Sequence, residues 1–570
     1  MKALTRILAA LMLAALTSCG KSEAQTPRKT EPELKILSFF IKEYPGAEVV
    51  IDDDVRTVTA RLAYGAYPGK AHIKFTVNDG VTAEPPSGSE VDLSAPVSIF
   101  LTDVDGNAKK YIVNAVVSKS PYVRLTKMLN KEYLRTASID GENIRFKLPV
   151  GADLTSLTFE ATADEGVTFD PDIAKPMNLT SPVRLKAVAP DGVAVENFIM
   201  SAEVEAQRAE VRGIYLPSPS HTSSFLTYDE VCRSVALLDE LNFNCLFVCA
   251  WAATKTAWDS DVLKANSSWS SARAGNMYAN YTGGSGDALA DIISEAHKKD
   301  IKVILWFEYG FMSSNGGVNM SDPLLSRHPD WIGRGNDGGY ANYNGTDYYL
   351  NGYSSEVQNF MMSLMKEALE RYPDVDGIQG DDRMPAMPRN SGYEESTKAA
   401  YRAEKGTEPP SDPSDAGWVR WRLDRLNSFA SAMHKELKAI KPDLMVCFAP
   451  NKYPWCMTHL MQEWPVWIKE GNVDLLTVQC YVTATYENDV KTAMSYARSS
   501  GAPGIVNPAM ILKNGSAVMS KSMLAGQLQY NRTVGTCGES QFWFDGLKED
   551  YVREVFKSFY TTKASLPGDL

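Results

Sequence analysis

The stretch 374-DVDGIQGDDRMPAMPRN-390 decides how the second part of the chain is interpreted. A short apolar run ends in two adjacent acids, Asp381 and Asp382, and prolines at 385 and 388 then interrupt any regular element. Apolar runs of strand length, separated by helical patterns, recur at 211–216, 244–251, 302–308, 375–380, 444–450, 474–482, 504–512 and 541–546. Such an alternation over about 350 residues is typical of an α/β fold, the (β/α)8 TIM barrel, which we place at residues 207–563.

A doubly wound open sheet is the alternative arrangement for this alternation of strands and helices. That fold typically has a glycine-rich phosphate-binding loop directly after its first strand. The first apolar run is instead followed by Pro217-Ser218-Pro219-Ser220, which contains no glycine. The barrel is therefore the favoured fold for this part of the chain.

The first third of the chain has a different composition and contains a repeat. All eleven tryptophans lie between Trp251 and Trp543, and none precedes them. The segment 79–113 is echoed by the segment 165–200. Short alternating segments bounded by Asp, Gly and Pro predict two all-β sandwiches, one over residues 35–118 and one over 119–206.

The two sandwiches resemble the tandem immunoglobulin-like modules of Bacteroidetes surface lipoproteins. The acidic turn Asp103-Val104-Asp105-Gly106-Asn107 in the first copy has the residue types of a calcium site. The second copy has only Pro190-Asp191-Gly192 at the matching place, so turn chemistry is the better interpretation. We therefore expect no metal there, and we expect the modules to act as spacers.

The N-terminus has the layout of a bacterial secretory signal. Lys2 and Arg6 precede a short apolar run, and Leu16-Thr17-Ser18-Cys19 resembles a lipobox. Residues 1–19 are thus interpreted as a lipoprotein signal peptide with lipidation at Cys19, and residues 20–34 as a tether. These features predict a cell-envelope lipoprotein of the outer membrane, on the cell surface or the periplasmic face, held to the membrane by its lipid anchor.

Charge and cysteine usage exclude several functions. The net charge of −12 is spread along the chain without basic patches, so nucleic acid is not an expected partner. Seven cysteines follow Cys19, an odd number without zinc-binding spacing, and several lie in apolar runs where a thiol behaves as a small hydrophobic group. We expect no disulfide framework, no metal and no organic cofactor.

Polar and aromatic residues gather at the ends of the predicted strands, where a barrel places its catalytic groups. Acids, amides and indoles at one rim are typical of a carbohydrate site, since amides and acids bind hydroxyls and indoles pack on sugar rings. The predicted catalytic residues are Asp381, Asp382 and Glu308. The predicted substrate-binding residues are Gln379, Trp251, Trp306, Asn451, Gln479, Tyr481, Trp543 and Asp545.

Several spaced motifs, including 212-RGIYL-216, 375-VDGIQGDDRMP-385 and 467-WIKEGNVDLLTVQCY-481, resemble the glycosyl hydrolase-like family 10 of bacterial proteins. The resemblance covers about residues 209–560. It implies a (β/α)8 barrel and carbohydrate hydrolysis in a family that includes cell-wall glycan hydrolases. The chain departs from the family pattern at Gln379, where the family has His, and at Glu308, where the family commonly has Asn.

Two mechanisms explain why a buried strand would end in paired acids. In the first, Asp381 is the nucleophile or activates water, as in the similar strand of the α-amylase clan, and a carboxyl across the barrel, Glu308 or Asp545, is the acid. In the second, both acids act, as in substrate-assisted N-acetylglucosaminidases, where one polarises the 2-acetamido group and the other donates a proton.

These observations together predict a lipid-anchored glycoside hydrolase whose substrate is a polysaccharide or cell-wall glycan. The alternative is a glycan-binding lipoprotein without catalytic activity, which would use the barrel as a binding platform. Retention of Asp381, Asp382 and Glu308 favours the enzyme. A scaffold protein of the envelope would be expected to have an empty rim at the strand ends, and this rim is not empty.

Overall fold

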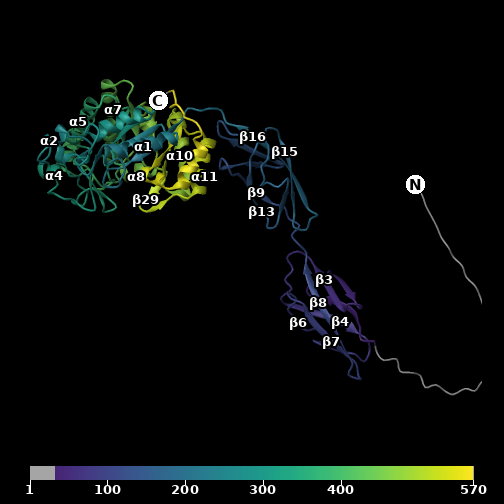
Figure 1. Ribbon diagram of the computed structural model, residues 1–570. Coiled ribbons are helices and arrows are strands. Elements are labelled where there is room, and N and C mark those ends of the chain that lie inside the picture. The colour runs from purple at the N-terminus through teal and green to yellow at the C-terminus, as the bar shows by residue number, and fades with distance from the viewer. Residues whose placement is uncertain (1–32, 569–570) are drawn as a thin grey trace, which may run out of the picture. The chain divides into compact units, whose positions relative to one another are not determined.

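The computed structural model of the protein describes residues 33–568 (Figure 1). The chain divides into two compact units. The first contains residues up to Val123 with the short segments 165–167 and 188–195, and the second contains 124–164, 168–187 and everything from Glu196 onward. Cys19, the signal peptide and nearly all of the predicted tether lie outside the described residues.

The first unit is built from two β-sheets around one core. Buried apolar residues of alternating strands fill this core, among them Ile41, Val58, Ile73 and Ile99. The strands of the larger sheet lie in the order β2 (Glu48–Asp52), β3 (Thr57–Leu62), β8 (Ala108–Val117), β7 (Val97–Thr102) and β5 (Thr82–Glu84). The smaller sheet contains β1 (Ile36–Ile41), β4 (Ala71–Val77) and β6 (Glu90–Val91).

The strands that follow repeat this arrangement, as the sequence repeat predicts. The larger sheet has the order β11 (Ser138–Asp140), β12 (Asn143–Leu148), β16 (Val195–Val204), β15 (Val183–Val188) and β14 (Thr168–Asp170). The smaller sheet contains β10 (Arg135–Thr136), β9 (Leu125–Asn130) and β13 (Phe159–Ala163). In both copies one strand pair of the larger sheet is parallel, β3 with β8 in the first and β12 with β16 in the second. The pairs β2 with β3, β7 with β8, and β11 with β12 are antiparallel.

A curled sheet of eight parallel strands forms the centre of the second unit. Its order is β27 (Leu475–Leu476), β26 (Met445–Phe448), β25 (Gly377–Gly380), β21 (Lys302–Trp306), β18 (Cys245–Cys249), β17 (Val211–Leu216), β31 (Gly538–Phe542) and β28 (Ala509–Ile511). The two outer strands approach each other through isolated parallel bridges, Leu476 with Val506 and Gln479 with Ala509. All eight carboxyl ends therefore lie at one edge of the sheet, which we call the mouth, and all eight amino ends lie at the base.

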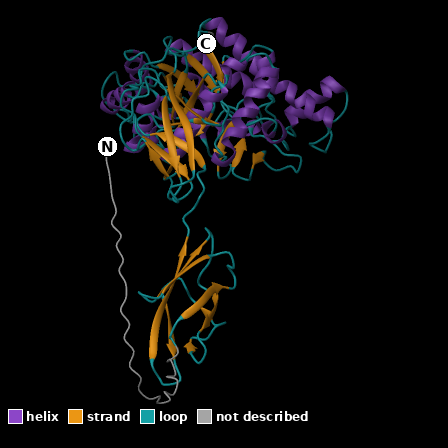
Figure 2. Cartoon of the chain, turned by 90° about the vertical axis from the view of Figure 1, so that its right-hand side faces the viewer, coloured by secondary structure: helices purple, strands orange, loops and turns teal. Residues whose placement is uncertain are grey.

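Helices follow these strands and pack on the outer face of the sheet (Figure 2). Their apolar faces and the outward-facing strand residues form one core, while the inward-facing residues, such as Tyr215, Phe247 and Ile304, form a separate core. The larger helices are α1 (Tyr228–Glu240), α3 (Ala288–His297), α5 (Ser355–Arg371), α7 (Ala416–Ile440), α10 (Tyr486–Ser499), α11 (Lys521–Val534) and α12 (Asp550–Phe559). Helix α1 starts at a capping box, in which Thr227 accepts from the Glu230 backbone and the Glu230 side chain accepts from that of Thr227.

Insertions at the mouth enlarge the loops that follow β18, β21, β25 and β26. After β21 the chain forms a small sheet of β22 (Met312–Asn315), β24 (Asp347–Tyr349) and β23 (Asn342–Tyr343). Further helices lie in these loops, namely α2 (Asp261–Ala265), α4 (Pro323–Arg327), α6 (Glu395–Lys405), α8 (Trp455–Leu460) and α9 (Trp464–Lys469). The mouth is therefore walled by segments that the strand–helix alternation does not include.

A buried cluster of charged residues closes the base, and we call Glu210, Arg212, Arg532 and Glu539 the base cluster. Glu210 Oε1 lies 2.8 Å from Arg212 Nε and 3.0 Å from Arg532 NH2, and its second oxygen lies 3.1 Å from Arg208 Nε. Glu539 Oε1 lies 3.3 Å from Arg532 NH1. These cations, against the effect of burial, hold the pKa of Glu210 below its ordinary value. The base cluster ties β17 and β31 to α11.

The second copy of the β region contacts α11 and α12 through side chains. Thr136 exchanges two hydrogen bonds with Gln529, of 2.9 and 2.7 Å. The buried Arg135 lies with its guanidinium 3.4 Å from the centre of the Phe559 ring. This region is thus packed against the helical layer, a contact that no feature of the sequence predicts.

The seven cysteines of the described chain are all free thiols, and six of them are buried, as their apolar neighbours predict. Between residues 33 and 568 no helix has both the length and the apolar character needed to cross a membrane.

Candidate active site at the mouth of the sheet

Strand β25 ends at Gly380, and the Asp381–Asp382 pair follows it directly at the mouth. Side chains alternate along a strand, so Gln379 and Asp381 both turn toward the inside of the curled sheet. Gln379 is fully buried, accepts a hydrogen bond of 2.9 Å from Tyr215 and donates one of 3.2 Å to Thr477. It therefore forms the floor beneath Asp381 and does not itself face the mouth, which corrects the substrate-binding role predicted for it.

Asp381 is only 1% exposed, and its two carboxylate oxygens differ in their surroundings. Oδ1 accepts hydrogen bonds of 2.7 Å from the backbone of Asp382 and 2.7 Å from Gln479 Nε2. Oδ2 is buried and has no hydrogen-bond partner among the described residues. A buried polar atom without a partner lowers the stability of the fold, so its presence at Asp381 calls for a functional explanation. Oδ2 is the one oxygen of Asp381 that makes no hydrogen bond among the described residues.

Arg383 brings the neighbouring acids together. Its NH1 atom lies 3.0 Å from Asp382 Oδ1 and 3.6 Å from Asp381 Oδ2, and its NH2 atom lies 3.7 Å from Asp347 Oδ2 on β24. Its Nε is buried without a partner in the part of the chain that the structure describes. Asp382 is thus the acid most directly paired with a cation.

Glu308 lies beside Asp381 on the neighbouring strand. Trp306 is in register with Gln379, and the ladder continues as the Phe307 N–H donates to the Gln379 carbonyl at 3.0 Å. Glu308 and Asp381 each follow two residues later, so their backbones lie about 4.8 Å apart if the spacing of neighbouring strands continues. Burial raises the pKa of Glu308, and its Oε2 has no partner within residues 33–568. The predicted second acid is therefore adjacent to the pair and does not lie across the barrel.

The pKa of Asp381 is raised far above its ordinary range. Burial is the main cause, the carboxylates of Asp382 and Glu308 add to it, and Arg383 opposes it. Because Oδ1 already accepts two N–H groups, the proton belongs on Oδ2, the oxygen without a partner. We call Glu308, Asp381, Asp382 and Arg383 the mouth cluster. It contains a buried carboxyl whose ionisation is disfavoured beside one that is paired with Arg383.

Aromatic rings surround the mouth cluster. Tyr481 and Phe542 lie 5.1 Å apart between ring centres, and Trp306 lies edge-on to Phe542 at 6.1 Å. The indole N–H groups of Trp306 and Trp543 are buried and lack hydrogen-bond partners among the described side chains and backbone. These two donors, together with the carboxyl oxygens, give the mouth unpaired polar groups against an aromatic wall. Such a composition suits a polyhydroxylated ligand.

Three predicted residues lie at the strand ends with other roles. Trp251 is fully buried, donates to the Gly310 carbonyl at 3.0 Å and packs edge-on against Phe360, so it presents no ring face to a ligand and its predicted binding role is not supported. Asp545 accepts from Thr222 and Ser224 and pairs with Lys548, so it fastens the loop after β17. Asn451, half-buried after β26, accepts from the Lys452 backbone at 3.2 Å.

Four neighbours of the site have no place in the sequence interpretation. Arg383 follows the acids directly and was the easiest of these to find. Tyr215 is hidden in an apolar strand, and Cys249 ends another such strand close to Glu308, whose pKa its thiol lowers. Asp347 belongs to an inserted hairpin, for which the strand–helix pattern gives no signal. Within the described chain no group of three or more His, Cys, Asp or Glu is arranged to hold a metal ion.

Two family models match this chain. The model described as Glycosyl hydrolase-like 10 matches residues 210–507, which is just over half of the chain. The model described as SGBP, N-terminal matches residues 36–115, the first β unit. The larger match contains β17 to β27 and every member of the mouth cluster.

Curated relatives and solved structures are similar at low identity. Glycosyl hydrolase YngK of Bacillus subtilis is 25% identical over 214 residues, which is 34% of this chain and 39% of the relative. Glycosyl hydrolase DigH of Escherichia coli is 26% identical over 226 residues, 37% of this chain and 45% of the relative. The chain thus matches less than half the length of either relative. The glycoside hydrolase domain of PgaB from Bordetella bronchiseptica gives a TM-score of 0.43 at 10% identity, covering 61% of this chain and 99% of that one.

Proposed function

Because the chain belongs to the Glycosyl hydrolase-like 10 family, we propose that it hydrolyses glycosidic bonds of a polysaccharide or cell-wall glycan at the mouth of its curled sheet. One observation carries the proposal. Asp381, Asp382 and Glu308 crowd around one guanidinium, and two of their buried oxygens, Asp381 Oδ2 and Glu308 Oε2, have no partner among the described residues. Three acids around a single guanidinium at the strand ends, with two buried oxygens left without a partner, suit groups that are kept for a substrate.

The different surroundings of Asp381 and Asp382 suggest separate roles. Asp381, protonated on Oδ2, is the proton donor to the glycosidic oxygen, and Gln479 holds its other oxygen in place. Asp382, paired with Arg383, is the charged carboxylate that stabilises positive charge on the sugar. Glu308 acts through Asp381, because a neighbouring carboxyl raises the pKa of the donor. Asp545, the acid across the sheet, is fastened by Thr222, Ser224 and Lys548, so it does not enter the mechanism.

This geometry favours the substrate-assisted route over a nucleophilic Asp381, since a protonated carboxyl is a poor nucleophile. The carbonyl oxygen of a 2-acetamido group bonds to C1 while the bond from C1 to the glycosidic oxygen breaks and that oxygen takes the Asp381 proton. Asp382 polarises the acetamido N–H during this step. Water then attacks C1, the ring formed by the acetamido group opens, and the water proton returns to Asp381.

A panel of glycans tests this function. The purified protein is incubated with oligosaccharides, including de-peptidylated cell-wall strands, and the products are analysed by mass spectrometry. We expect cleavage of a glycan that carries N-acetylhexosamine, inhibition by a thiazoline analogue, and no covalent sugar on the protein. A trapped glycosyl ester on Asp381 would instead support the nucleophilic route, and the absence of any cleavage across the panel would remove the hydrolase proposal.

A glycan-binding lipoprotein without catalysis is the second candidate, and the match of residues 36–115 to the SGBP N-terminal model favours it. Under this alternative the mouth holds a glycan but the acids do not turn it over. Binding without cleavage by the wild-type protein, unchanged in Asp381→Asn, would support it. The unpaired carboxyl oxygens are the reason that we place hydrolysis first.

The finer architecture is part of the same proposal. The parallel bridges between β27 and the β28 region support closure of the sheet into a full (β/α)8 barrel over residues 207–563. The repeated strand order supports two immunoglobulin-like modules at 35–118 and 119–206. We place the protein in the outer membrane as a lipoprotein acylated on Cys19. Labelling with a fatty-acid analogue should mark the wild type and Cys232→Ala but not Cys19→Ala, and label on Cys19→Ala would contradict the anchor.

A further inference from the structure

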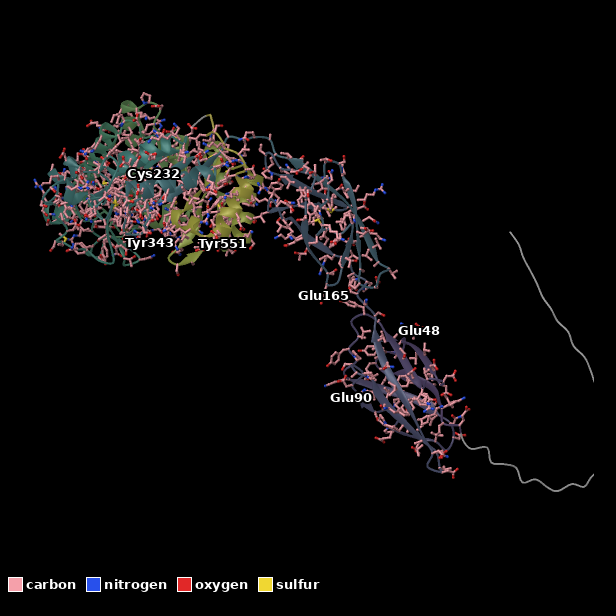
Figure 3. The ribbon with its side chains drawn as sticks, in the orientation of Figure 1. Glu48, Glu90, Glu165, Cys232, Tyr343 and Tyr551 are labelled. Carbon is pink, nitrogen blue, oxygen red and sulfur yellow. The ribbon has the colours of Figure 1, made fainter. Side chains whose placement is uncertain are left out.

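A second hollow opens beside the mouth, in loops that the proposed mechanism does not use. It has a volume of about 260 Å³. Its wall is formed by residues of three loops, those after β21, β25 and β26: Asn342, Tyr343, Arg389, Asn390, Thr458 and His459. Figure 3 labels Tyr343 on the second unit.

The same segments build this hollow and the mouth cluster. The hairpin that carries Tyr343 also carries Asp347, which lies 3.7 Å from Arg383. The segment that carries Arg389 begins at Asp381, and Gln462, just after the loop of His459, donates to the Asp381 carbonyl at 2.9 Å. The backbone N–H of Arg389 donates to the His459 carbonyl at 3.0 Å. The loops that build the mouth cluster and the loops that line the hollow are therefore the same, and hydrogen bonds connect them.

The wall of the hollow has a chemistry opposite to that of the mouth. Arg389 makes one side-chain hydrogen bond, of 3.3 Å to the Thr458 carbonyl, and it pairs with no carboxylate in the described part of the chain. None of the residues that line the hollow is an acid. The mouth, by contrast, has three acids against one arginine. A ligand group with negative charge is therefore attracted at the hollow, because Arg389 lies there without a paired carboxylate and no acid lines the wall.

Aromatic faces accompany this cation. The Tyr343 and Trp455 rings meet edge-on with centres 5.7 Å apart, and the exposed His459 ring stacks on Trp455 at 4.6 Å. The wall is also held in place, because the buried Arg422 on α7 donates to the carbonyls of Arg389 and Ser391. A preformed wall with flat rings, an amide and a guanidinium can bind a sugar ring and a carboxylate together.

We propose that this hollow is a second subsite that binds a carboxylate-bearing sugar residue of the same glycan chain whose bond lies at the mouth. The inference rests on the proposed function for the chain at the mouth, and it names the substrate class as an acidic glycan. Arg389 pairs with the carboxylate, Tyr343 packs against the ring, and Asn390 binds its hydroxyls. The protein then selects chains in which acidic residues alternate with, or lie near, the residue that is cleaved.

Binding to the Asp381→Asn protein tests the subsite separately from cleavage. The probes are oligomers that contain N-acetylmuramic acid and oligomers of uronic acid, each beside the same oligomer with its carboxyl groups reduced to alcohols. We expect at least one acidic oligomer to bind ten-fold or more tightly than its reduced form, by calorimetry. Arg389→Gln should abolish this preference and leave the affinity for the reduced form unchanged. Arg233→Gln, on the exposed side of α1, is the matched control and should change neither.

Each result decides between the two proposals. Equal affinity for acidic and reduced oligomers, a preference that survives Arg389→Gln, or no binding of any acidic oligomer overturns the subsite. If Asp381→Asn shows an Arg389-dependent preference and the wild-type protein cleaves none of the probes, the subsite is kept and the hydrolase is removed. Cleavage without that preference does the reverse. Tyr343→Ala provides a second variant, expected to weaken both forms of the oligomer, and thermal melting confirms that each variant folds.

Discussion

The two ends of one sheet hold buried charges in opposite ways. At the base, Glu210 and Glu539 are paired with Arg208, Arg212 and Arg532, and Tyr560 donates to Glu539 at 2.7 Å. At the mouth, Asp381 and Glu308 each have an oxygen without a partner in residues 33–568. Both clusters are removed from water, and Glu210 Oε2 at the base also makes no hydrogen bond among the described residues. The difference lies in the ratio of charges, with three arginines for two acids at the base and one arginine for three acids at the mouth. The base uses its charges to hold strands and helices together, whereas the mouth keeps its charges available for a ligand.

The largest expected effect is at the base. Arg532→Met leaves Glu210 and Glu539 short of their shared cation, so we expect the free energy of unfolding to fall by about 3–5 kcal/mol, the usual cost of breaking a buried ion pair. Tryptophan fluorescence during urea denaturation measures it, because all eleven tryptophans lie between residues 251 and 543. Arg233→Met is the exposed control. A loss below about 1 kcal/mol would mean that the base does not depend on pairing.

The next effect is on activity at the mouth. Asp381→Asn should lower turnover by ~10²-fold or more, about 2.7 kcal/mol in the transition state, without lowering the free energy of unfolding. The amide removes a carboxyl whose ionisation is disfavoured by burial, so a small gain in stability is expected. Asp382→Asn should lower turnover similarly. Steady-state kinetics on a cleaved glycan, beside denaturation curves, measure both. Full activity in both variants would place the acids outside the chemistry.

The two clusters should respond to pH in opposite directions. The pKa of Glu210 is lowered in the folded protein, so its contribution to stability is present above about pH 4.5, its unfolded value, and is lost as pH falls through the folded pKa. The pKa of Asp381 is raised, so its contribution is fully present below about pH 3.8 and is lost as pH rises through the folded pKa.

Denaturation curves recorded across pH separate these contributions. Glu210→Gln should flatten the acid side of the stability profile, while Asp381→Asn should flatten the rise on lowering pH from neutrality. The comparison fails if both variants change the same side of the profile.

The smallest effect concerns Glu308. Its carboxyl raises the pKa of Asp381, so Glu308→Gln should lower that pKa. Because the donor must be protonated, activity is lost as pH rises through its pKa, and the basic limb of kcat/KM should move to lower pH in this variant. The pH profile of kcat/KM measures the shift. A basic limb that stays in place, with only a lower maximum, would make Glu308 a direct participant and not a group that acts through Asp381.

The strand–helix alternation in the sequence predicts the number and order of the strands of the curled sheet. Several strands are shorter than their apolar runs, and β31 (Gly538–Phe542) begins three residues before its predicted run at 541–546. The run 474–482, for example, contains a strand of only two residues, because the chain leaves the ladder where Gln479 and Tyr481 turn to the mouth. The alternation of inward and outward residues follows from the strands, which is why Asp381 was found. The same alternation made Gln379 a predicted ligand. Gln379 lies on the same face of β25 as Asp381 but two residues earlier, so it lies beneath the site.

Contacts between distant segments explain what the sequence did not predict. A tryptophan at a strand end packs equally well in a core or on a ligand, and for Trp251 the inserted Gly310 carbonyl and Phe360 decide for the core. Asp347 reaches the mouth cluster, and Tyr343 the hollow, through a hairpin whose short strands have no clear periodicity. Thr136 contacts Gln529, 393 positions later in the chain, and Arg135 contacts Phe559. A local pattern contains no information about such partners.

The buried thiols on the inside of the curled sheet can report how often the sheet opens. Cys245, Cys249 and Cys447 are buried in the inner core, and burial raises their pKa values, so these three thiols are protected in the folded molecule, whereas Cys232 is partly exposed. A thiol reagent reacts with the three buried thiols only in molecules whose strands have separated, and the reaction rate then reports how often the sheet opens. Ligands that occupy the mouth slow this reaction in proportion to their affinity, so glycans can be ranked as ligands without any being cleaved.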